Sequence, residues 1–114
     1  MWSNSDYLPG IDVSAYKENI DWQKVKDSGV AYTFIKATEG TTYLDKYFDN
    51  NWSGARRAGV IRGAYHFFIP NIDPVEQANH YLDVVCYILH KSDLPPVIDI
   101  ESSPKYVYEA FLTL

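Results

Sequence analysis

The stretch Pro96-Val97-Ile98-Asp99-Ile100-Glu101 alternates β-branched apolar residues with two carboxylates. This alternation predicts a β-strand, in which side chains two positions apart share a face and lie roughly 6–7 Å apart. Asp99 and Glu101 would then lie side by side, with Ile98 and Ile100 on the opposite face. Two acids on one face repel each other. Either this is an edge strand whose polar face is exposed to solvent, or the pair serves proton transfer, charge stabilisation or metal binding.

Outward from this strand, strand-like and helix-like segments alternate along the chain. We expect strands at residues 10–14, 30–36, 61–68 and 96–101, and helices at 21–28, 46–58, 73–90 and from 106 onward. Asp21 and Asp73 are expected to cap their helices, and residues 37–42 are expected to form a loop. The order predicts one α/β domain over residues 1–114, with a parallel sheet and crossover helices.

Polar side chains stand near the end of every expected strand. In parallel α/β folds, ligand sites gather beyond the carboxyl ends of the strands. The residues found there carry ionisable or hydroxyl groups: Asp12, Ser14, Lys36, Glu39, Tyr65, His66, Asp99 and Glu101. Their convergence on one rim favours a functional site over a wet edge.

Composition narrows the function classes. The net charge of −5 argues against a nucleic-acid partner, which demands clustered Lys and Arg. Aromatic residues make up 16% of the chain, which suits stacking on sugar rings, although core packing explains most aromatics. No apolar run approaches the ~20 residues of a membrane span, and no signal peptide is visible. Cys86 lies in an apolar run, so we expect a buried structural thiol. No His/Cys cluster predicts a metal site, which leaves a cation on Asp12, Asp99 and Glu101 as the minor alternative.

Five segments in this order resemble the glycoside hydrolase family 25 lysozymes, the muramidases of bacteria, fungi and bacteriophages. They are Gly10-Ile11-Asp12-Val13-Ser14, Ile20-Asp21-Trp22, Ile35-Lys36-Ala37-Thr38-Glu39-Gly40, Gly63-Ala64-Tyr65-His66-Phe67 and Val97-Ile98-Asp99-Ile100-Glu101. The resemblance covers about residues 8–101. It implies a TIM-like parallel β/α barrel, with only about its first half, four βα units, in this chain. It also implies hydrolysis of the β-1,4 bond between N-acetylmuramic acid and N-acetylglucosamine in peptidoglycan, without a cofactor.

The resemblance also assigns roles to the candidate residues. Glu101 would be the general acid, a carboxyl kept protonated near neutral pH with the help of the Asp99 charge. Asp99 would be a nucleophile or, as we favour, the group that orients the 2-acetamido group of the substrate in a retaining reaction. Asp12 would line the same site as a substrate-binding carboxylate. Tyr65 would lie near the scissile bond, although a Tyr packed at a strand end is equally expected.

Three further residues, Glu39, Lys36 and His66, have two interpretations each. Glu39 either contacts substrate or forms a buried ion pair with Lys36 that holds the second strand and its loop. His66 is flanked by aromatic residues, which favours a satisfied core histidine over a catalytic base.

The resemblance leaves the second half of the barrel unaccounted for, since such barrels typically need ~200–250 residues. We expect a C-terminally truncated catalytic domain. The alternatives are self-association through unpaired sheet edges and poor folding of the isolated chain. The expected partners are peptidoglycan glycan strands, with no nucleic acid and no membrane, in an extracellular or cell-wall location reached by secretion or phage lysis. The alternative function is a non-catalytic glycan-binding remnant.

Overall fold

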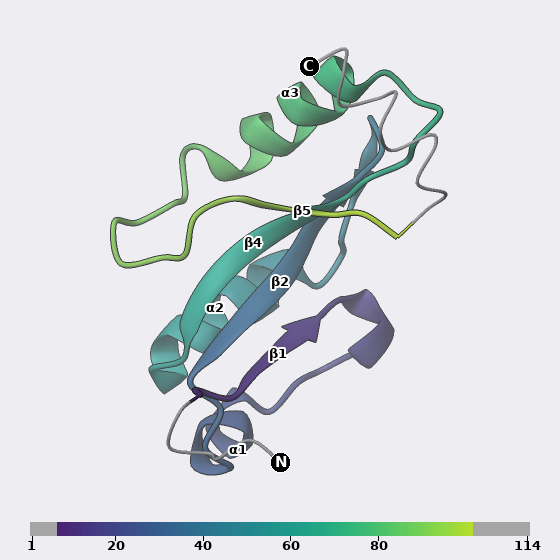
Figure 1. Cartoon of the computed structure of the whole chain (residues 1–114). Helices are drawn as coiled ribbons and strands as arrows, with labels where there is room; N and C mark the ends of the chain where they lie inside the picture. The colour runs from purple at the N-terminus through teal and green to yellow at the C-terminus, as the bar shows by residue number, and fades with distance from the viewer. Residues whose placement is uncertain (1–6, 102–114) are drawn as a thin grey trace.

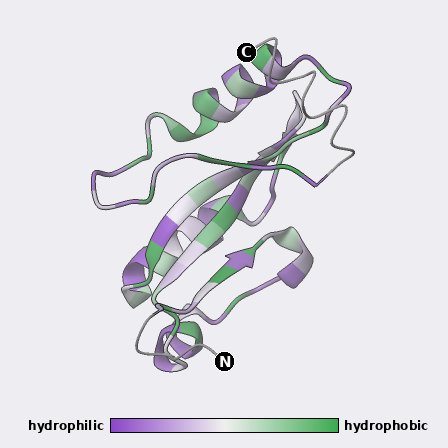
Figure 2. Cartoon of the chain, in the orientation of Figure 1, coloured by the Kyte–Doolittle hydropathy of each residue, from purple (hydrophilic) through white to green (hydrophobic). Residues whose placement is uncertain are grey.

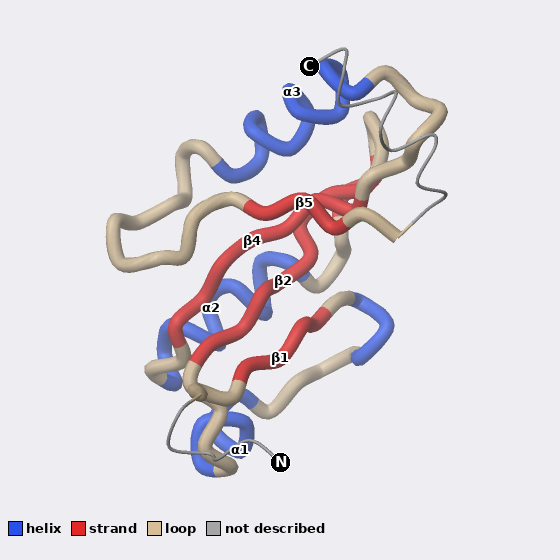
Figure 3. The backbone as a smooth tube through the Cα atoms, in the orientation of Figure 1, coloured by secondary structure: helices blue, strands red, loops and turns tan. Residues whose placement is uncertain are grey.

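A sheet of mainly parallel strands organises the molecule (Figure 1). The computed structural model describes residues 7–101. Four parallel strands lie in the order β1 (Gly10–Val13), β2 (Tyr32–Glu39), β4 (Ile61–Phe67) and β5 (Val97–Asp99). A short strand β3 (Tyr43–Leu44) pairs antiparallel with β2. The helical elements are η1 (Ala15–Lys17), α1 (Trp22–Asp27), α2 (Phe48–Ala58) and α3 (Pro74–Val85), and they connect the parallel strands (Figure 3). The predicted α/β class and parallel sheet are confirmed.

Both predicted helix caps are present. Asp21 accepts a hydrogen bond from the backbone N–H of Lys24 at 3.2 Å, and Asp73 accepts one from the N–H of Val75 at 2.8 Å. Gly29 adopts a positive φ of 96°, which lets the chain leave α1 at the expected place. These signals are local, which explains why sequence alone located the helix starts.

The third helix is shorter than predicted, because it ends at Val85 and not at residue 90. Beyond it, the backbone N–H of His90 donates to the carboxylate of Asp93 at 2.8 Å, which holds the segment in turns. The prediction of a buried thiol at Cys86 was also wrong. Cys86 is the C-cap of α3, and one helical step of about 100° from the buried Val85 turns its side chain away from the core, so it is exposed.

The second strand extends further than predicted, so the expected loop at residues 37–42 was wrong for residues 37–39 and correct for residues 40–42. Residues 37–39 continue β2, and the chain then turns at Gly40, with φ 57°, into β3. The pairing of β2 with β4 shifts register between Lys36 and Thr38. This irregularity places Thr38 opposite His66 and Glu39 opposite Phe67.

The two faces of the sheet differ, as the alternating hydropathy along the central strands suggests (Figure 2). One, called the packed face here, includes Thr33, Ile35, Ala64 and His66, all buried beneath the helices. A cluster of apolar residues fills the space between this face and the helices: Val13, Trp22, Ile35, Ala37, Phe48, Trp52, Ala55, Val60, Ala64, Tyr81 and Val85. The other, called the open face, includes Asp12, Phe34, Lys36, Tyr65 and Asp99, none of which is fully buried. Strand register supports this assignment, because residues that pair across neighbouring strands point to the same face of the sheet.

One ion pair is buried on the packed face. Arg62 of β4 donates from Nε to Asp93 Oδ1 at 2.8 Å and from Nη1 to the carbonyl of Trp52 at 2.8 Å. Its guanidinium also lies 3.9 Å from the centre of the Trp52 ring. The pair therefore links β4 to α2 and to the segment before β5. Within residues 7–101, the structure contains no helix long and apolar enough to cross a membrane.

Candidate active site

A pocket of about 470 Å³ lies on the open face, around the carboxyl ends of the parallel strands. Its walls contain Asp12, Phe34, Tyr65, Val97, Ile98, Asp99, Ile100 and Glu101. Four of the five residues predicted for the site therefore share one pocket, although they come from three different strands and the residues after β5. Glu39 is not in the pocket wall.

Strand register explains how these side chains meet. Asp12 of β1 pairs with Phe34 of β2, and Phe34 pairs with Gly63 of β4. A Cβ atom at Gly63 would lie 2.9 Å from the Phe34 ring, so glycine leaves the space that this ring occupies on the open face. Tyr65 follows two residues later and pairs with Val97 at the start of β5. The alternation of the strands then brings Asp99 to the same face. Strand β5 is shorter than the predicted strand at residues 96–101, because it ends at Asp99, and Glu101 follows it.

The two acids of the opening motif share one pocket wall. Asp99 and Glu101 lie two residues apart in it, and a hydrogen bond between their carboxyl groups needs a proton on one of them. Burial, followed by this hydrogen bond and the charges of Glu101 and Asp12, raises the pKa of Asp99 to about 6. The positive charge of Lys36 opposes the rise. The pair can therefore hold one proton at mildly acidic pH, as proton transfer to a leaving oxygen requires.

Tyr65 contributes a phenol that stays protonated. Burial raises its pKa above the ordinary range, and the charges of Asp99, Asp12, Asp45 and Glu101 add to the rise. A neutral phenol among carboxylates acts as a hydrogen-bond donor. Tyr65 thus combines a partly packed ring with a polar group in the pocket.

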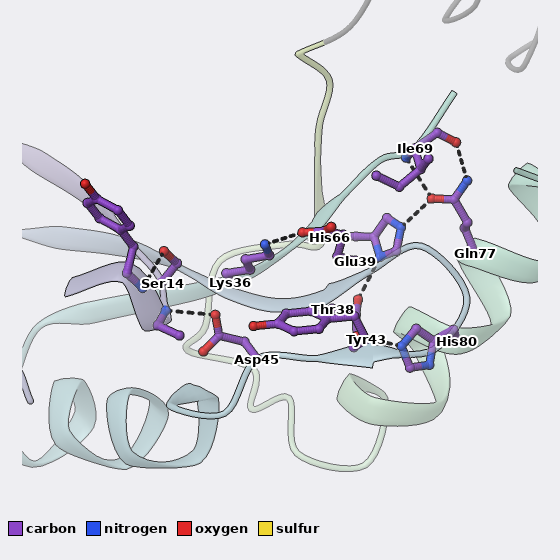
Figure 4. Close-up of polar contacts among 12 residues, drawn as sticks. Ser14, Lys36, Thr38, Glu39, Tyr43, Asp45, His66, Ile69, Gln77 and His80 are labelled. Atoms are coloured by element: carbon purple, nitrogen blue, oxygen red, sulfur yellow. Dashed lines mark hydrogen bonds and ion pairs between the residues drawn. The ribbon is translucent and has the colours of Figure 1, made fainter. Parts of the chain in front are cut away.

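Glu39 forms the ion pair that was one of its two predicted interpretations (Figure 4). Its Oε1 lies 2.5 Å from Nζ of Lys36. The same ammonium lies 5.1 Å from the centre of the Tyr43 ring and 5.0 Å from that of Phe67. A substrate contact by Glu39 stays a prediction.

His66 is a satisfied core histidine, as predicted. It is buried on the packed face, where Nδ1 lies 2.7 Å from the Thr38 hydroxyl and Nε2 lies 2.9 Å from Gln77 Oε1 (Figure 4). The same Gln77 oxygen accepts a hydrogen bond from the N–H of Ile69, so Nε2 must be the protonated ring nitrogen. Burial lowers the pKa of His66, which favours this neutral form.

Two residues that support the rim were missed from sequence. Gln77 also donates to the carbonyls of Ile69 and Ile72, at 2.7 and 3.0 Å, and so holds the loop after β4. Asp45 is buried and accepts hydrogen bonds from the N–H groups of Ala15 and Tyr47, at 2.8 and 2.9 Å. Its bond to Tyr47, two residues on, is an Asx turn that sequence could have suggested. Its bond to Ala15, thirty residues away, had no sequence signal.

Asp12, Asp99 and Glu101 share the pocket without forming a metal site. No group of three His, Cys, Asp or Glu side chains within residues 7–101 is arranged to hold a metal ion.

Comparisons with known proteins agree with this geometry. The family model for glycosyl hydrolases family 25 matches residues 11–111. The chain is 44% identical over 103 residues to the uncharacterized protein YegX of Escherichia coli K12, covering 86% of this chain and 37% of that protein. It is 43% identical over 99 residues to Lysozyme M1 of Streptomyces globisporus, covering 85% of this chain and 34% of the relative. The structure superposes on a family 25 glycosyl hydrolase from Bacillus anthracis with a TM-score of 0.80 and 37% identity, over 90% of this chain and 46% of that one. The chain thus spans little more than a third of these curated relatives.

Proposed function

Because this chain belongs to glycosyl hydrolase family 25, we propose that it carries the acid pair of a peptidoglycan hydrolase. The bond cleaved is the β-1,4 linkage between N-acetylmuramic acid and N-acetylglucosamine, and the site of action is the bacterial cell wall. The observation that supports this most directly is the placement of Asp99 and Glu101 in one pocket on the open face, where the pKa of Asp99 is raised to about 6. Asp12 and Tyr65 complete the polar lining around the pair.

In the proposed reaction, Glu101 donates its proton to the glycosidic oxygen as the bond to the anomeric carbon breaks. Asp99, as the anion, accepts a hydrogen bond from the 2-acetamido N–H and orients the acetamido oxygen. That oxygen attacks the anomeric carbon and forms a cyclic oxazolinium intermediate. Water then opens the ring after giving a proton to Glu101, so the anomeric configuration is retained. Tyr65 donates a hydrogen bond in the pocket, and Asp12 accepts one from the sugar.

The test is clearance of purified peptidoglycan by the 114-residue chain, followed as loss of turbidity. Glu101→Gln removes the transferable proton and keeps the shape, so the rate should fall by about 10²–10⁴-fold. Asp83→Asn is a matched acid-to-amide control, because Asp83 is exposed on α3, away from the pocket. Its rate should equal that of the wild type.

A wild-type chain that clears walls no faster than Glu101→Gln would rule out enzymatic activity for this chain. Co-sedimentation with insoluble peptidoglycan then separates the remaining outcomes. Binding that is lost on substitution of Tyr65 by Ala would support a glycan-binding role for the same pocket.

A further inference from the structure

One cation, Lys36, lies on the open face that also carries Asp99, and neither the family match nor the proposed reaction gives it a role. We propose that Lys36, held by Glu39 and two aromatic rings, is a positioning residue that favours the ionised form of Asp99. An ionised Asp99 is the form that accepts a hydrogen bond from the 2-acetamido N–H in the proposed reaction. This inference rests on the proposed function for its consequence in catalysis, but the electrostatic claim can be measured without it.

Strand register places Lys36 close to Asp99. Glu39 of β2 pairs with Phe67 of β4, and Phe67 pairs with Asp99 of β5, so these three residues form a row across the rim of the open face. The Lys36 ammonium bonds to the first member of this row and lies 5.0 Å from the ring of the second. The ammonium group therefore lies on the same face as the third member, and its charge lowers the pKa of that carboxyl.

The way Lys36 is held keeps it from neutralising Asp99 directly. Its side chain is 14% exposed, and the rings of Tyr43 and Phe67 lie near its ammonium group. Within the described part of the chain, the only carboxylate within ion-pair distance of Nζ is that of Glu39. The positive charge of Lys36 thus acts on Asp99 without an ion pair, and the Asp99 oxygens stay available to bind the acetamido group of the substrate.

The charged groups around Asp99 make the positive charge of Lys36 important for the protonation of Asp99. The groups that face it are Asp12 from β1, Lys36 and Glu39 from β2, Tyr65 from β4, and Glu101 beyond β5. Lys36 is the one cation in this set among residues 7–101. With Lys36 removed, burial and the remaining acids would favour a proton on Asp99, and a protonated Asp99 no longer attracts the acetamido N–H.

The experiment is a carboxyl ¹³C NMR titration of Asp99 in the full 114-residue chain, between about pH 3 and 9. Lys36→Met should raise the midpoint by at least about half a pH unit, since it deletes the charge and keeps the length. Lys36→Arg should leave the midpoint within a few tenths of the wild-type value. Glu39→Gln should lower it, because an anion is lost and the field of Lys36 is no longer offset.

Several outcomes overturn the proposal. An unchanged midpoint in a folded Lys36→Met chain, judged by its amide NMR spectrum, would do so. If Lys36→Met does not fold, Glu39→Gln decides, and a midpoint that stays or rises contradicts the proposal.

The titration needs no turnover, so it can succeed even if the wall-clearing assay fails, and the two claims are tested separately. Where the wild type clears walls, Lys36→Met should also move the acidic limb of the pH–rate profile to higher pH, and Lys36→Arg should restore it. A purely structural role for Lys36 would lower the rate without moving that limb.

Discussion

The two faces of the sheet consist of alternate residues of the same strands. Charged side chains are paired with opposite charges on one face, whereas like charges lie together on the other. On the packed face, the charged side chain of Arg62 is matched by Asp93 and a carbonyl. On the open face, the carboxylates of Asp99 and Glu101 repel each other, and within residues 7–101 Lys36 is the one cation whose charge lowers the pKa of Asp99. The comparison indicates that the packed face supplies stability and that the open face gives up some stability for its acid pair. Substitutions on the two faces should therefore have separable effects.

The largest effect is expected at the buried ion pair. Arg62→Ala leaves Asp93 without its partner, and the side chain of Asp93 is only 5% exposed. Removal of one member of a buried pair costs about 3–5 kcal/mol, a large part of the stability of a small domain. Urea unfolding at pH 7, followed by Trp fluorescence, measures it, and Arg56→Ala on the exposed side of α2 is the control, with a change within about 0.5 kcal/mol. Equal losses in the two variants would show that the pair is not a main link of the packed face.

A smaller contrast lies within the packed face, at two fully buried threonines of β2. Among residues 7–101, the Thr33 hydroxyl has no hydrogen-bond partner, whereas the Thr38 hydroxyl bonds to His66 Nδ1 at 2.7 Å. Thr33→Val should therefore stabilise the fold by about 1 kcal/mol, and Thr38→Val should destabilise it by about 1–2 kcal/mol. The same urea experiment checks both signs. A loss of stability in both variants would mean that the change in side-chain shape, and not the hydrogen bonding of the hydroxyl, determines the effect.

The same comparison explains how much could be predicted from sequence. Alternation in residues 97–99 and the caps at Asp21 and Asp73 are local signals, and each was read correctly, although the strand ends before Glu101. The register shift after Lys36 is not local, because it depends on how β2 pairs with β4. Strict alternation would have sent Lys36 and Glu39 to opposite faces, so the pattern of single residues could not decide between their two interpretations.

The end of α3 and the role of Asp45 show the same limit. The apolar run that suggested a longer helix continues past the end of α3 at Val85. Beyond this run, His90 donates to Asp93, which is itself fixed by Arg62 from a distant strand. Asp45 joins the segment after β1 to the start of α2. Both depend on contacts between residues far apart in sequence, which composition and periodicity do not report.

The smallest effect, and the one most specific to the comparison, is the pH dependence of stability. The pKa of Asp99 is raised from 3.8 to about 6, so between these values the folded chain holds a proton that the unfolded chain has released. This group therefore lowers the free energy of unfolding as pH rises from about 4 to 6. His66 on the packed face acts in the opposite direction. Its pKa is lowered from 6.5 by burial, so stability is lost as pH falls below 6.5.

Asp99→Asn removes the first of these opposing contributions and leaves the second. At pH 7 the variant should be more stable than the wild type by about 1 kcal/mol, after allowance for solvent screening of a partly exposed carboxyl. Below about pH 4 the difference should vanish, because both forms are then neutral. Urea unfolding at pH 4, 5, 6 and 7 measures the difference. A gap that stays constant across this range would locate the effect in packing or hydrogen bonding, and the open face would then carry no electrostatic cost for its acid pair.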